Sequence, residues 1–369
     1  MVLKAQDEFF IERTLQLARK GIGWASPNPQ VGAVVVHEGK VLAEGYHRRV
    51  GVPHAEVEAL KRLSGKLPSG AILYVNLEPC DHHGRTPPCT DLLLKSGLQR
   101  VVVGMIDPNP RVRGRGVRRL REAGVDVTVG VLREKCYRLN ESYAKWIRRG
   151  IPFVTLKMAA SLDGGIAAAD GSSRWVTGPL ARQKVHRLRS EVDAVLVGVG
   201  TVLKDDPYLT TRPLRSAHQP VRVILDTHLR IPERSRLVRG ASQVPVWVVC
   251  GVKIVTSKVQ RLKDRGVRII PVISKQGEVL WRPLLKRLGA EGITNLLVEG
   301  GGEVASSALG AGVVDKLLYF VAPKLFGGKG TLSSFPKWGV RNIRQALELE
   351  EICVEKIGED YLFEGYLKR

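Results

Sequence analysis

Residues 54–89, HAEVEALKRLSGKLPSGAILYVNLEPCDHHGRTPPC, contain the side chains around which the N-terminal half of the chain is organised. His54, Cys80 and Cys89 offer one imidazole and two thiolates, which are ligands that Zn²⁺ prefers. Three protein ligands leave a tetrahedral ion with one open position for water, as in catalytic rather than structural zinc sites. Glu56 lies two residues after the histidine, where its carboxylate can carry protons to and from that water. The stretch therefore predicts a zinc site that activates water.

The order of these residues, His-x-Glu, then Pro-Cys, then Cys, is typical of zinc deaminases that act on nucleobases. Eight residues separate the two cysteines here, where two are usual. Two other interpretations stay open. The histidine and glutamate could be ordinary first-turn helix residues beside buried thiols. Alternatively, His82 or His83 could supply a fourth ligand, which would close the site and abolish water activation.

Length and composition indicate an ordinary globular protein with more than one domain. The chain has 369 residues, more than a single core usually spans, and 44% of them are hydrophobic and 25% charged. It shows neither an apolar run of about eighteen residues nor the apolar core of a signal peptide, so we expect a cytoplasmic protein without a membrane partner. Three scattered cysteines remain besides the predicted zinc ligands, which fits a reducing compartment. These are Cys136, Cys250 and Cys353.

The formal net charge of +22 attracts nucleic acid or phosphorylated small molecules. Its densest patch is 111–121, with six arginines in eleven residues. Aromatic residues make up only 6% of the chain, and none lies within that patch to stack on bases. We therefore favour a solvated helix face over an RNA-binding surface.

Strands and helices alternate along the first half, which predicts an α/β sandwich. We expect helices at 7–20, 55–63, from Cys89, within the arginine-rich patch and at 132–149, and strands at 33–36, 41–46, 71–77, 100–105 and 125–130. His54 and Cys89 then lie at helix N-termini, where the dipole favours thiolate over thiol. Asn28 precedes the first strand and is either a turn former or a group that reaches a base edge. Gly150-Ile151-Pro152 marks a domain boundary, giving domains at 1–149 and 150–369.

The alternation resumes in the second half and predicts a second α/β domain. We expect strands at 153–159, 194–199, 221–225, 244–250, 295–299 and 316–322, and helices at 179–191, 281–288 and 304–309. Two glycine-rich stretches, 198–201 and 299–302, follow strands directly. Bare backbone at a helix N-terminus can cradle a pyrophosphate, although such glycines may serve only a tight turn. The Rossmann pattern Gly-x-Gly-x-x-Gly with a following acidic residue is absent.

Polar residues of the second half gather at 161–177 and 201–212. Arg189 and Arg212 are candidate phosphate clamps, although with 58 basic residues in the chain an arginine present by chance is the safer interpretation of either. Asp205 lies beside another aspartate and a proline, where aspartate is usually a turn former. Trp175 lies in a loop rich in Gly and Ser, an unusual place for a core residue.

Taken together, these motifs closely resemble the bifunctional deaminase/reductase family of riboflavin biosynthesis over essentially the whole chain. The N-terminal motifs are Asn28-Pro-x-Val-Gly32, Gly45-Tyr-His47, His54-Ala-Glu56, Glu78-Pro-Cys80, His83-Gly-Arg-Thr-Pro-Pro-Cys89, Asp107-Pro-Asn-Pro110 and Gly114-x-Gly116. The C-terminal motifs are Leu156-Lys157, Ser161-Leu-Asp-Gly164, Ser173-x-Trp175-Val-Thr-Gly178, the segment 200–212 and Glu299-Gly-Gly301. The eight-residue gap between the cysteines is this family's own. One departure is Gly165, at a position where the family commonly has a basic residue.

The resemblance implies the α/β class with two α/β domains, a cytidine-deaminase-like α/β/α sandwich and a dihydrofolate-reductase-like domain. The first would hydrolyse an amino group of a diaminopyrimidinone that carries a ribosylamino 5-phosphate, with zinc on His54, Cys80 and Cys89 and Glu56 as proton donor. The second would use NADPH to reduce the ribose to a ribityl chain. The implied substrate contacts are Ser173, Arg189, Leu209, Arg212 and Glu299. The implied cofactor contacts are Ala159, Trp175, Thr201, Asp205, Thr227, Gly301, Gly302, Glu303, Val304, Ala305, Ser306 and Ser307.

Two rival functions follow from the residues alone. A zinc deaminase acting on a base within RNA would need base flipping and a salt-dependent affinity, and the long second domain and scarce aromatics argue against it. A non-catalytic zinc-stabilised nucleic-acid binder would follow if a fourth ligand closed the metal site. We expect the partner to be a phosphorylated pyrimidine, with no nucleic acid or membrane required, and the chain to form a homo-oligomer.

Overall fold

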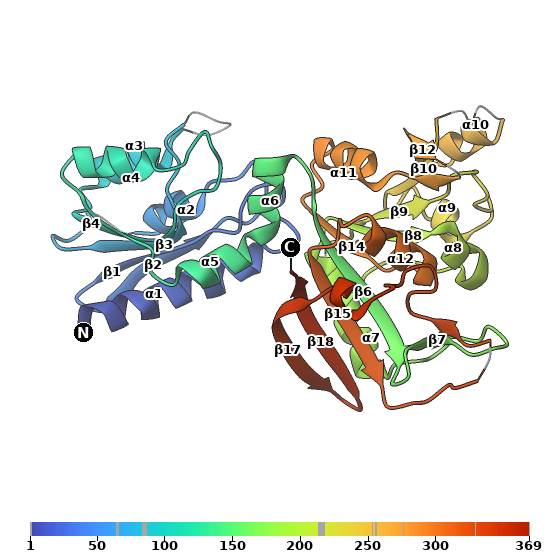
Figure 1. The fold of residues 1–369 in the computed structure, drawn as a ribbon. Coiled ribbons are helices and arrows are strands. Elements are labelled where there is room, and N and C mark those ends of the chain that lie inside the picture. Colours follow the sequence, from blue (N-terminus) through green and yellow to red (C-terminus); the bar gives the residue numbers. More distant parts are fainter. Residues whose placement is uncertain are drawn as a thin grey trace. The chain divides into compact units, whose positions relative to one another are not determined.

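The computed structural model describes residues 2–63, 66–82, 87–212, 218–252, 254, 257–275, 277–328 and 330–368. The chain divides into two compact units, Met1–Gly150 and Ile151–Arg369 (Figure 1). Among the described residues, no helix has both the length and the apolar character needed to cross a bilayer.

The described part of the N-terminal unit is built on a five-stranded sheet with strand order β2-β1-β3-β4-β5. Its elements are α1 (Val2–Ala18), η1 (Arg19–Gly21), β1 (Gly32–His37), β2 (Lys40–Tyr46), α2 (Ala55–Lys61), β3 (Ile72–Leu77), α3 (Cys89–Ser96), β4 (Arg100–Met105), α4 (Arg115–Glu122), β5 (Asp126–Val129), α5 (Arg133–Leu139) and α6 (Glu141–Arg149). One face of the sheet packs on α2, α3 and α4, and the other on α1 and α5 (Figure 1). This is the expected α/β/α sandwich.

Strand directions bring one edge of this sheet together as a site. β3 and β4 are parallel, so the segments that follow them emerge at the same edge. β1 is antiparallel to β3, with Ala33 opposite Val75, so the loop before β1 reaches that edge too. β2 ends there as well, because Tyr46 pairs with Gly32.

The single helix expected at 132–149 is in fact two helices, α5 and α6, which break at Asn140. Asn140 is 1% exposed, and its backbone leaves the helical region at φ −113° and ψ 17°. Its side chain accepts a hydrogen bond from Gln30 N at 2.8 Å and donates to Gln30 O at 3.0 Å. At the break, the Asn140 side chain therefore hydrogen-bonds the backbone N–H and C=O of Gln30, in the loop that leads into β1. Helical periodicity does not reveal this tertiary contact.

The described part of the C-terminal unit contains a nine-stranded sheet with strand order β11-β10-β9-β8-β14-β6-β15-β18-β17. Its strands are β6 (Phe153–Ser161), β8 (Ala194–Gly198), β9 (Val221–Leu225), β10 (Val246–Gly251), β11 (Val267–Val272), β14 (Asn295–Val298), β15 (Lys316–Ala322), β17 (Leu349–Ile357) and β18 (Asp360–Leu367). Two short pairs, β7 (Gly165–Ala167) with β16 (Leu332–Ser333) and β12 (Ser274–Lys275) with β13 (Glu278–Val279), lie outside it. Along the sheet, the neighbouring strands β11, β10, β9, β8, β14, β6 and β15 run parallel to one another. β18 is antiparallel to both of its neighbours, β15 and β17.

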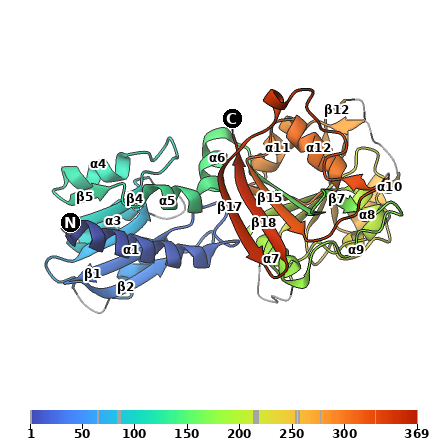
Figure 2. The ribbon, with the colours of Figure 1, turned by 60° about the horizontal axis from the view of Figure 1, so that its bottom comes forward.

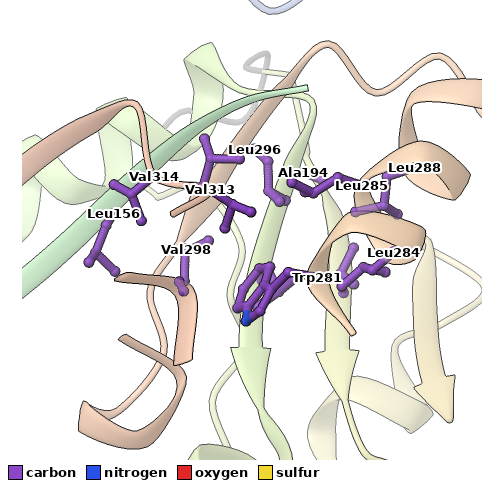
Figure 3. Close-up of a cluster of buried hydrophobic side chains, with 14 of the residues drawn as sticks. Leu156, Ala194, Trp281, Leu284, Leu285, Leu288, Leu296, Val298, Val313 and Val314 are labelled. Carbon is purple, nitrogen blue, oxygen red and sulfur yellow. The ribbon is translucent and has the colours of Figure 1, made fainter. Parts of the chain in front are cut away.

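Helices cover both faces of this sheet. They are α7 (Pro179–Glu191), α8 (Val199–Asp205), α9 (Arg236–Arg239), α10 (Ser257–Asp264), α11 (Trp281–Ala290) and α12 (Gly302–Gly310), with η2 (Ile343–Gln345) near the C-terminus. Trp281, Leu284 and Leu288 of α11 are buried together with Leu296 and Val298 of β14, as Figure 3 shows. Each such large side chain stabilises the fold by about 1.5–3 kcal/mol. The carboxyl end of β14, from which the next segment begins, is therefore held in place by a packed core.

Several parts of this unit differ from expectation, and the elements β11, α9 and α10 were not expected. The strand expected through Val199 ends at Gly198, and the glycine-rich stretch after it begins helix α8. The C-terminal hairpin of β17 and β18 was not expected at all (Figure 2). Residues 350–356 of β17 are exposed on both faces of the strand, so the hydrophobic alternation that identifies a half-buried strand is missing.

Candidate functional sites

The three predicted zinc ligands lie together in the N-terminal unit. His54 is the N-cap of α2, Cys80 follows β3, and Cys89 begins α3. His54 Nδ1 is 3.2 Å from Cys89 Sγ and 3.5 Å from Cys80 Sγ. Tetrahedral zinc with Zn–S bonds of about 2.3 Å and a Zn–N bond of about 2.0 Å holds N and S roughly 3.5 Å apart, so the donor set fits this ion.

Among the described residues, the group of metal-binding side chains consists of His54, Cys80 and Cys89 and includes no fourth ligand. His82 lines the neighbouring cavity but does not join the three donor atoms, and His83 lies outside the described residues. The described donors therefore match a site that keeps one position open.

The electrostatics of the ligands differ from the expectation for Cys89. The backbone N–H of Cys89 in the first turn of α3 donates to Cys80 Sγ at 3.4 Å, so the helix start stabilises an anion at Cys80 rather than at Cys89 itself. A hydrogen bond from the Cys89 thiol, supported by His54, lowers the pKa of Cys80 to about 4. The same thiol–thiolate hydrogen bond and burial raise the pKa of Cys89. The hydrogen bond to Cys80 raises the pKa of His54 to about 8.

Glu56 lies in the first turn of α2 and is only 3% exposed. Burial is the main cause that raises its pKa above the ordinary carboxyl value. A carboxyl group with a raised pKa takes up a proton more readily than an exposed one, so the environment suits the predicted proton shuttle.

A cavity of about 440 Å³ adjoins these residues, and the predicted residue Asn28 lines it. Asn28 Nδ2 lies 3.0 Å from His47 Nε2, and His47 Nδ1 lies 3.2 Å from Pro53 O. Because a carbonyl can only accept, His47 Nδ1 carries the proton and Nε2 accepts from the Asn28 amide. Burial lowers the pKa of His47, which keeps it neutral. Asn28 therefore retains its carbonyl oxygen for a ligand.

Asp107 lines this cavity, although the motif Asp107-Pro-Asn-Pro110 gave it no predicted role. It follows β4 and is 6% exposed, and burial raises its pKa to about 6. Tyr143 donates its hydroxyl to Asp107 Oδ1 at 3.1 Å. A polar residue directly after a buried strand, at the same edge as Cys80, is the sequence signal that could have identified it.

The C-terminal unit contains a second cavity of about 560 Å³ at the carboxyl ends of β6, β14, β8 and β9. Most of the predicted reductase residues line it. These are Ala159, Ser173, Thr201, Asp205, Thr227, Glu299, Gly301, Gly302, Glu303, Val304 and Ser307. Sequence positions far apart thus meet along one edge of the sheet, as ligand sites of open parallel sheets do.

Six predicted residues do not line this cavity. Arg189 binds Glu299, and Arg212 is exposed over the ring of Tyr208. Trp175 is 63% exposed and packs under the Arg182 guanidinium. The remaining three are buried, namely Leu209, Ala305 and Ser306. The amide of Ala305 already donates to Gly301 O, so in the described part of the chain the amides of residues 302–304 are those without a partner inside α12.

The glycines at this cavity serve two different purposes. A Cβ on Gly302 would lie 2.5 Å from Pro336 Cδ, so packing requires glycine there. A Cβ on Gly301 would meet no atom closer than 3.9 Å, and one on Gly200 would meet none within 4 Å, yet both residues line the cavity. Side chains at these two positions would enter the cavity itself. The cradle at the starts of α8 and α12 therefore fits a phosphate-bearing ligand.

One end of the second cavity carries a group of charged residues. Arg189 binds Glu299 with Nε–Oε1 at 2.7 Å and Nη2–Oε2 at 2.9 Å, a bidentate pair that is nearly buried. Burial alone would raise the pKa of Glu299, but the guanidinium lowers it overall. Lys157 on β6 lines the cavity beside them, and burial lowers its pKa. Lys157 belongs to the Leu156-Lys157 motif but has no predicted role, because a lysine inside a strand pattern usually faces solvent.

These two sites define a bifunctional enzyme, in which a zinc-binding hydrolytic deaminase domain and a reductase domain share one chain. The family model described as the cytidine and deoxycytidylate deaminase zinc-binding region matches residues 4–105. The model described as the RibD C-terminal domain matches residues 152–363. The chain therefore belongs to the RibD family of riboflavin biosynthesis proteins, and its fold class and paired deaminase and reductase activities are as predicted.

Curated relatives and solved structures match nearly the full length. The riboflavin biosynthesis protein RibD of Aquifex aeolicus (strain VF5) is 43% identical, covering 97% of this chain and 98% of its own. That of Escherichia coli (strain K12) is 39% identical, covering 96% and 100%. Acinetobacter baumannii RibD, form 1, superposes with a TM-score of 0.89 at 35% identity over 99% and 100% of the chains. The diaminohydroxyphosphoribosylaminopyrimidine deaminase/5-amino-6-(5-phosphoribosylamino)uracil reductase of Thermotoga maritima gives 0.88 at 38% identity, with 99% of each chain covered.

Proposed function

We propose that the chain acts on 2,5-diamino-6-ribosylamino-4(3H)-pyrimidinone 5′-phosphate in two steps, with deamination in residues 1–149 and reduction in residues 150–369. The observation that carries the proposal is the close approach of His54 Nδ1 to both cysteine sulfurs beside the buried Glu56. The full-length similarity to RibD relatives supports the pairing of the two activities on a pyrimidine substrate. It gives no support to the alternative of an RNA base deaminase.

The deamination needs a nucleophile and a proton carrier. His54, Cys80 and Cys89 would hold Zn²⁺, which would supply a Lewis acid that lowers the pKa of water to about 7. Glu56 accepts a proton from this water while the water oxygen bonds to the carbon that carries the amino group. It then delivers protons to the ring nitrogen and to the departing amine, so that the C–N bond breaks and ammonia leaves. Asn28 orients the base by accepting a hydrogen bond through Oδ1.

The reduction needs a hydride and a proton. The cavity of the C-terminal unit would hold NADPH, which would supply the hydride that C1′ of the sugar accepts. The bond from C1′ to the ring oxygen breaks, and that oxygen takes a proton. Lys157 is the ammonium that lines the cavity next to Glu299, and its lowered pKa favours release of this proton. The unpaired amides of residues 302–304, with Gly301 and Gly200 leaving room, hold the pyrophosphate.

The predicted residues outside the cavity receive narrower roles. Arg189 is a positioning residue that orients Glu299 toward the substrate. Trp175 and Arg212 belong to segments whose neighbours Ser173 and Asp205 line the cavity, so they remain predicted ligand contacts. Leu209, Ala305 and Ser306 support the cavity from the core side.

Two variants test the proposal on the full chain. Glu56→Gln should retain zinc and lose ammonia release, because the proton carrier is removed and the ligands are not. Cys80→Ser should lose zinc and deamination but still consume NADPH when supplied with the deaminated intermediate. Wild-type protein that releases no ammonia, or consumes no NADPH, on the diaminopyrimidinone phosphate would defeat the proposal. Loss of both activities in Cys80→Ser would mean that the metal stabilises both domains.

The remaining expectations concern partners and location. A cytoplasmic site of action, a phosphorylated substrate and independence of nucleic acid stay predictions. Self-association also stays a prediction, and β17 is the surface that favours it. This strand has a single described neighbour in its sheet, and Ile352 and Val354 on it are 59% and 52% exposed. An open edge with exposed apolar side chains is a template for pairing with a second copy.

A further inference from the structure

The cavity of the C-terminal unit extends beyond the glycine cradle to a cationic side chain, Arg230, that none of the proposed steps uses. We infer that Arg230 recognises the 2′-phosphate of NADPH and thereby sets the preference for NADPH over NADH. This inference rests on the proposed function, since it concerns the dinucleotide of the reductase site.

The order of the strands places the adenosine end of the dinucleotide at Arg230. The cavity crosses neighbouring strands in the order β6, β14, β8 and β9. Lys157 and Glu299, the groups that act on the sugar, belong to β6 and to the end of β14. The cradle at Gly301 and Gly200 follows β14 and β8. Strands are about 4.8 Å apart, so the segment after β9 lies about 10 Å across the sheet from the end of β14. A dinucleotide with its nicotinamide at β6 and its pyrophosphate in the cradle therefore extends its adenosine toward β9.

The loop that carries Arg230 is held in place by its own hydrogen bonds. Asp226, at the end of β9, is fully buried and accepts the amide of Ile231 at 2.7 Å through Oδ2. Leu229 is 4% exposed, its amide donates to Asp226 O at 3.0 Å, and Lys258 Nζ donates to Leu229 O at 2.8 Å. A loop fixed in this way presents a side chain to a ligand at a small entropic cost.

Among the residues that the structure describes, the Arg230 guanidinium forms one long ion pair and no hydrogen bond. The ion pair joins Arg230 Nε to Asp226 Oδ1 at 4.0 Å, beyond hydrogen-bond distance, and the Arg230 side chain is 60% exposed. Within the described residues, Asp226 Oδ1 has no hydrogen-bond partner. The buried carboxylate therefore attracts the guanidinium toward the cavity end without occupying its donors.

The other cations that line the cavity in the described residues are engaged elsewhere. Lys157 faces Glu299 at the opposite end. Lys337 Nζ forms an ion pair with Glu303 Oε1 at 2.8 Å and is also attracted by the charge of Glu278. Lys204 extends toward the loop at 170–171, where its charge helps to lower the pKa of Asp170. Arg230 is thus the lining cation at the adenosine end whose donors remain available.

The chemistry of a guanidinium suits this ligand. A planar fork of N–H donors binds phosphate oxygens in pairs, and an arginine accommodates the 2′-phosphate in other dinucleotide folds. The 2′-hydroxyl of NADH offers no charge to this group. Arg230 should therefore discriminate between the two dinucleotides without contacting the reacting atoms.

The test measures equilibrium binding of NADPH, NADH, adenosine 2′,5′-bisphosphate and 5′-AMP to the full chain by calorimetry. Wild-type protein should bind the 2′-phosphorylated member of each pair at least about tenfold more tightly. Arg230→Met should abolish this ratio by weakening the 2′-phosphorylated ligands, with NADH and 5′-AMP unchanged. Arg234→Met is the matched control, because this exposed arginine lies on the same segment outside the cavity lining. It removes the same charge and should keep the wild-type ratio.

Each outcome bears on the inference. A wild-type ratio retained in Arg230→Met overturns it, as does an equal loss in Arg234→Met, which would indicate a long-range charge effect. Wild-type protein that binds NADPH and NADH equally overturns it while leaving the proposed reductase in place. Failure of wild-type protein to bind either dinucleotide defeats the proposed function and this inference with it. In steady state, Arg230→Met should raise the KM for NADPH and leave kcat unchanged.

Discussion

Removal of the Arg189 guanidinium should destabilise the C-terminal domain strongly and in a pH-dependent way. Arg189→Met keeps a long apolar stem but deletes both hydrogen bonds to Glu299, whose side chain is 7% exposed. Breaking a buried ion pair by deleting one partner costs about 3–5 kcal/mol, because the remaining charge stays buried. We expect a loss in that range at pH 7.

The sign of the pH dependence follows from Glu299. In the wild-type protein its pKa is lowered, so the stability from this pair is present above the unfolded pKa of about 4.5 and is lost as pH falls through the folded pKa. In Arg189→Met the guanidinium no longer opposes burial, and the pKa of Glu299 should rise above its unfolded value. Protonation then relieves the buried charge, so the cost of the substitution should shrink as the pH is lowered from 7 toward 5.

Amide hydrogen exchange measured by mass spectrometry resolves this effect within the full chain. Peptides from α7 and β14 should lose protection in Arg189→Met, whereas peptides from β1 and β3 serve as an internal control. The double variant Arg189→Met/Glu299→Gln should recover much of the loss, because the unpaired charge is gone. A loss below about 1 kcal/mol, or one that is equal at pH 5 and pH 7, would refute the role we give to this pair.

Three further predictions concern other parts of the molecule. Asp107 lines the deaminase cavity and burial raises its pKa to about 6, so we expect deaminase kcat/KM to fall as the carboxylate is protonated below that pH, and this inflection should vanish in Asp107→Asn; an unchanged profile would show that the Asp107 carboxylate takes no part in deamination. Asn140→Ala should destabilise the N-terminal domain by about 1–3 kcal/mol in hydrogen exchange of peptides around Gln30, because the Gln30 N–H loses its partner, while Gln30 O keeps only the hydrogen bond from Asn76; wild-type protection there would show that the contact is dispensable. Ile352→Lys should convert a homo-oligomer to monomers in light scattering, whereas Leu325→Lys, at a residue 74% exposed outside β17, should not; identical masses for all three proteins would exclude β17 as the interface.

The elements that the sequence predicted well are those whose signal is local. The strand Arg100–Met105 is a continuous buried run, and helix Pro179–Glu191 opens with proline, so both have the expected bounds. The motif spacing likewise brought His54, Cys80 and Cys89 into one group. Local patterns were sufficient in each case.

The elements that sequence reasoning missed depend on distant contacts. Asn140 interrupts a helical pattern to satisfy Gln30, which lies far away in the sequence. The strand Leu349–Ile357 lacks alternation because both of its faces are exposed. Arg189 reads as a phosphate clamp until Glu299 is seen to occupy its donors. Such pairings depend on the folded sheet and leave no periodic trace in the chain.

The hydrolytic function of the N-terminal domain depends most directly on how the metal is coordinated. Zinc-edge X-ray absorption of the purified full chain, together with elemental analysis, should find one zinc per chain with one nitrogen, two sulfurs and one exchangeable oxygen at about 2.0–2.3 Å. A second protein nitrogen in place of the oxygen, or protein that binds no zinc, would contradict the hydrolytic role of this site.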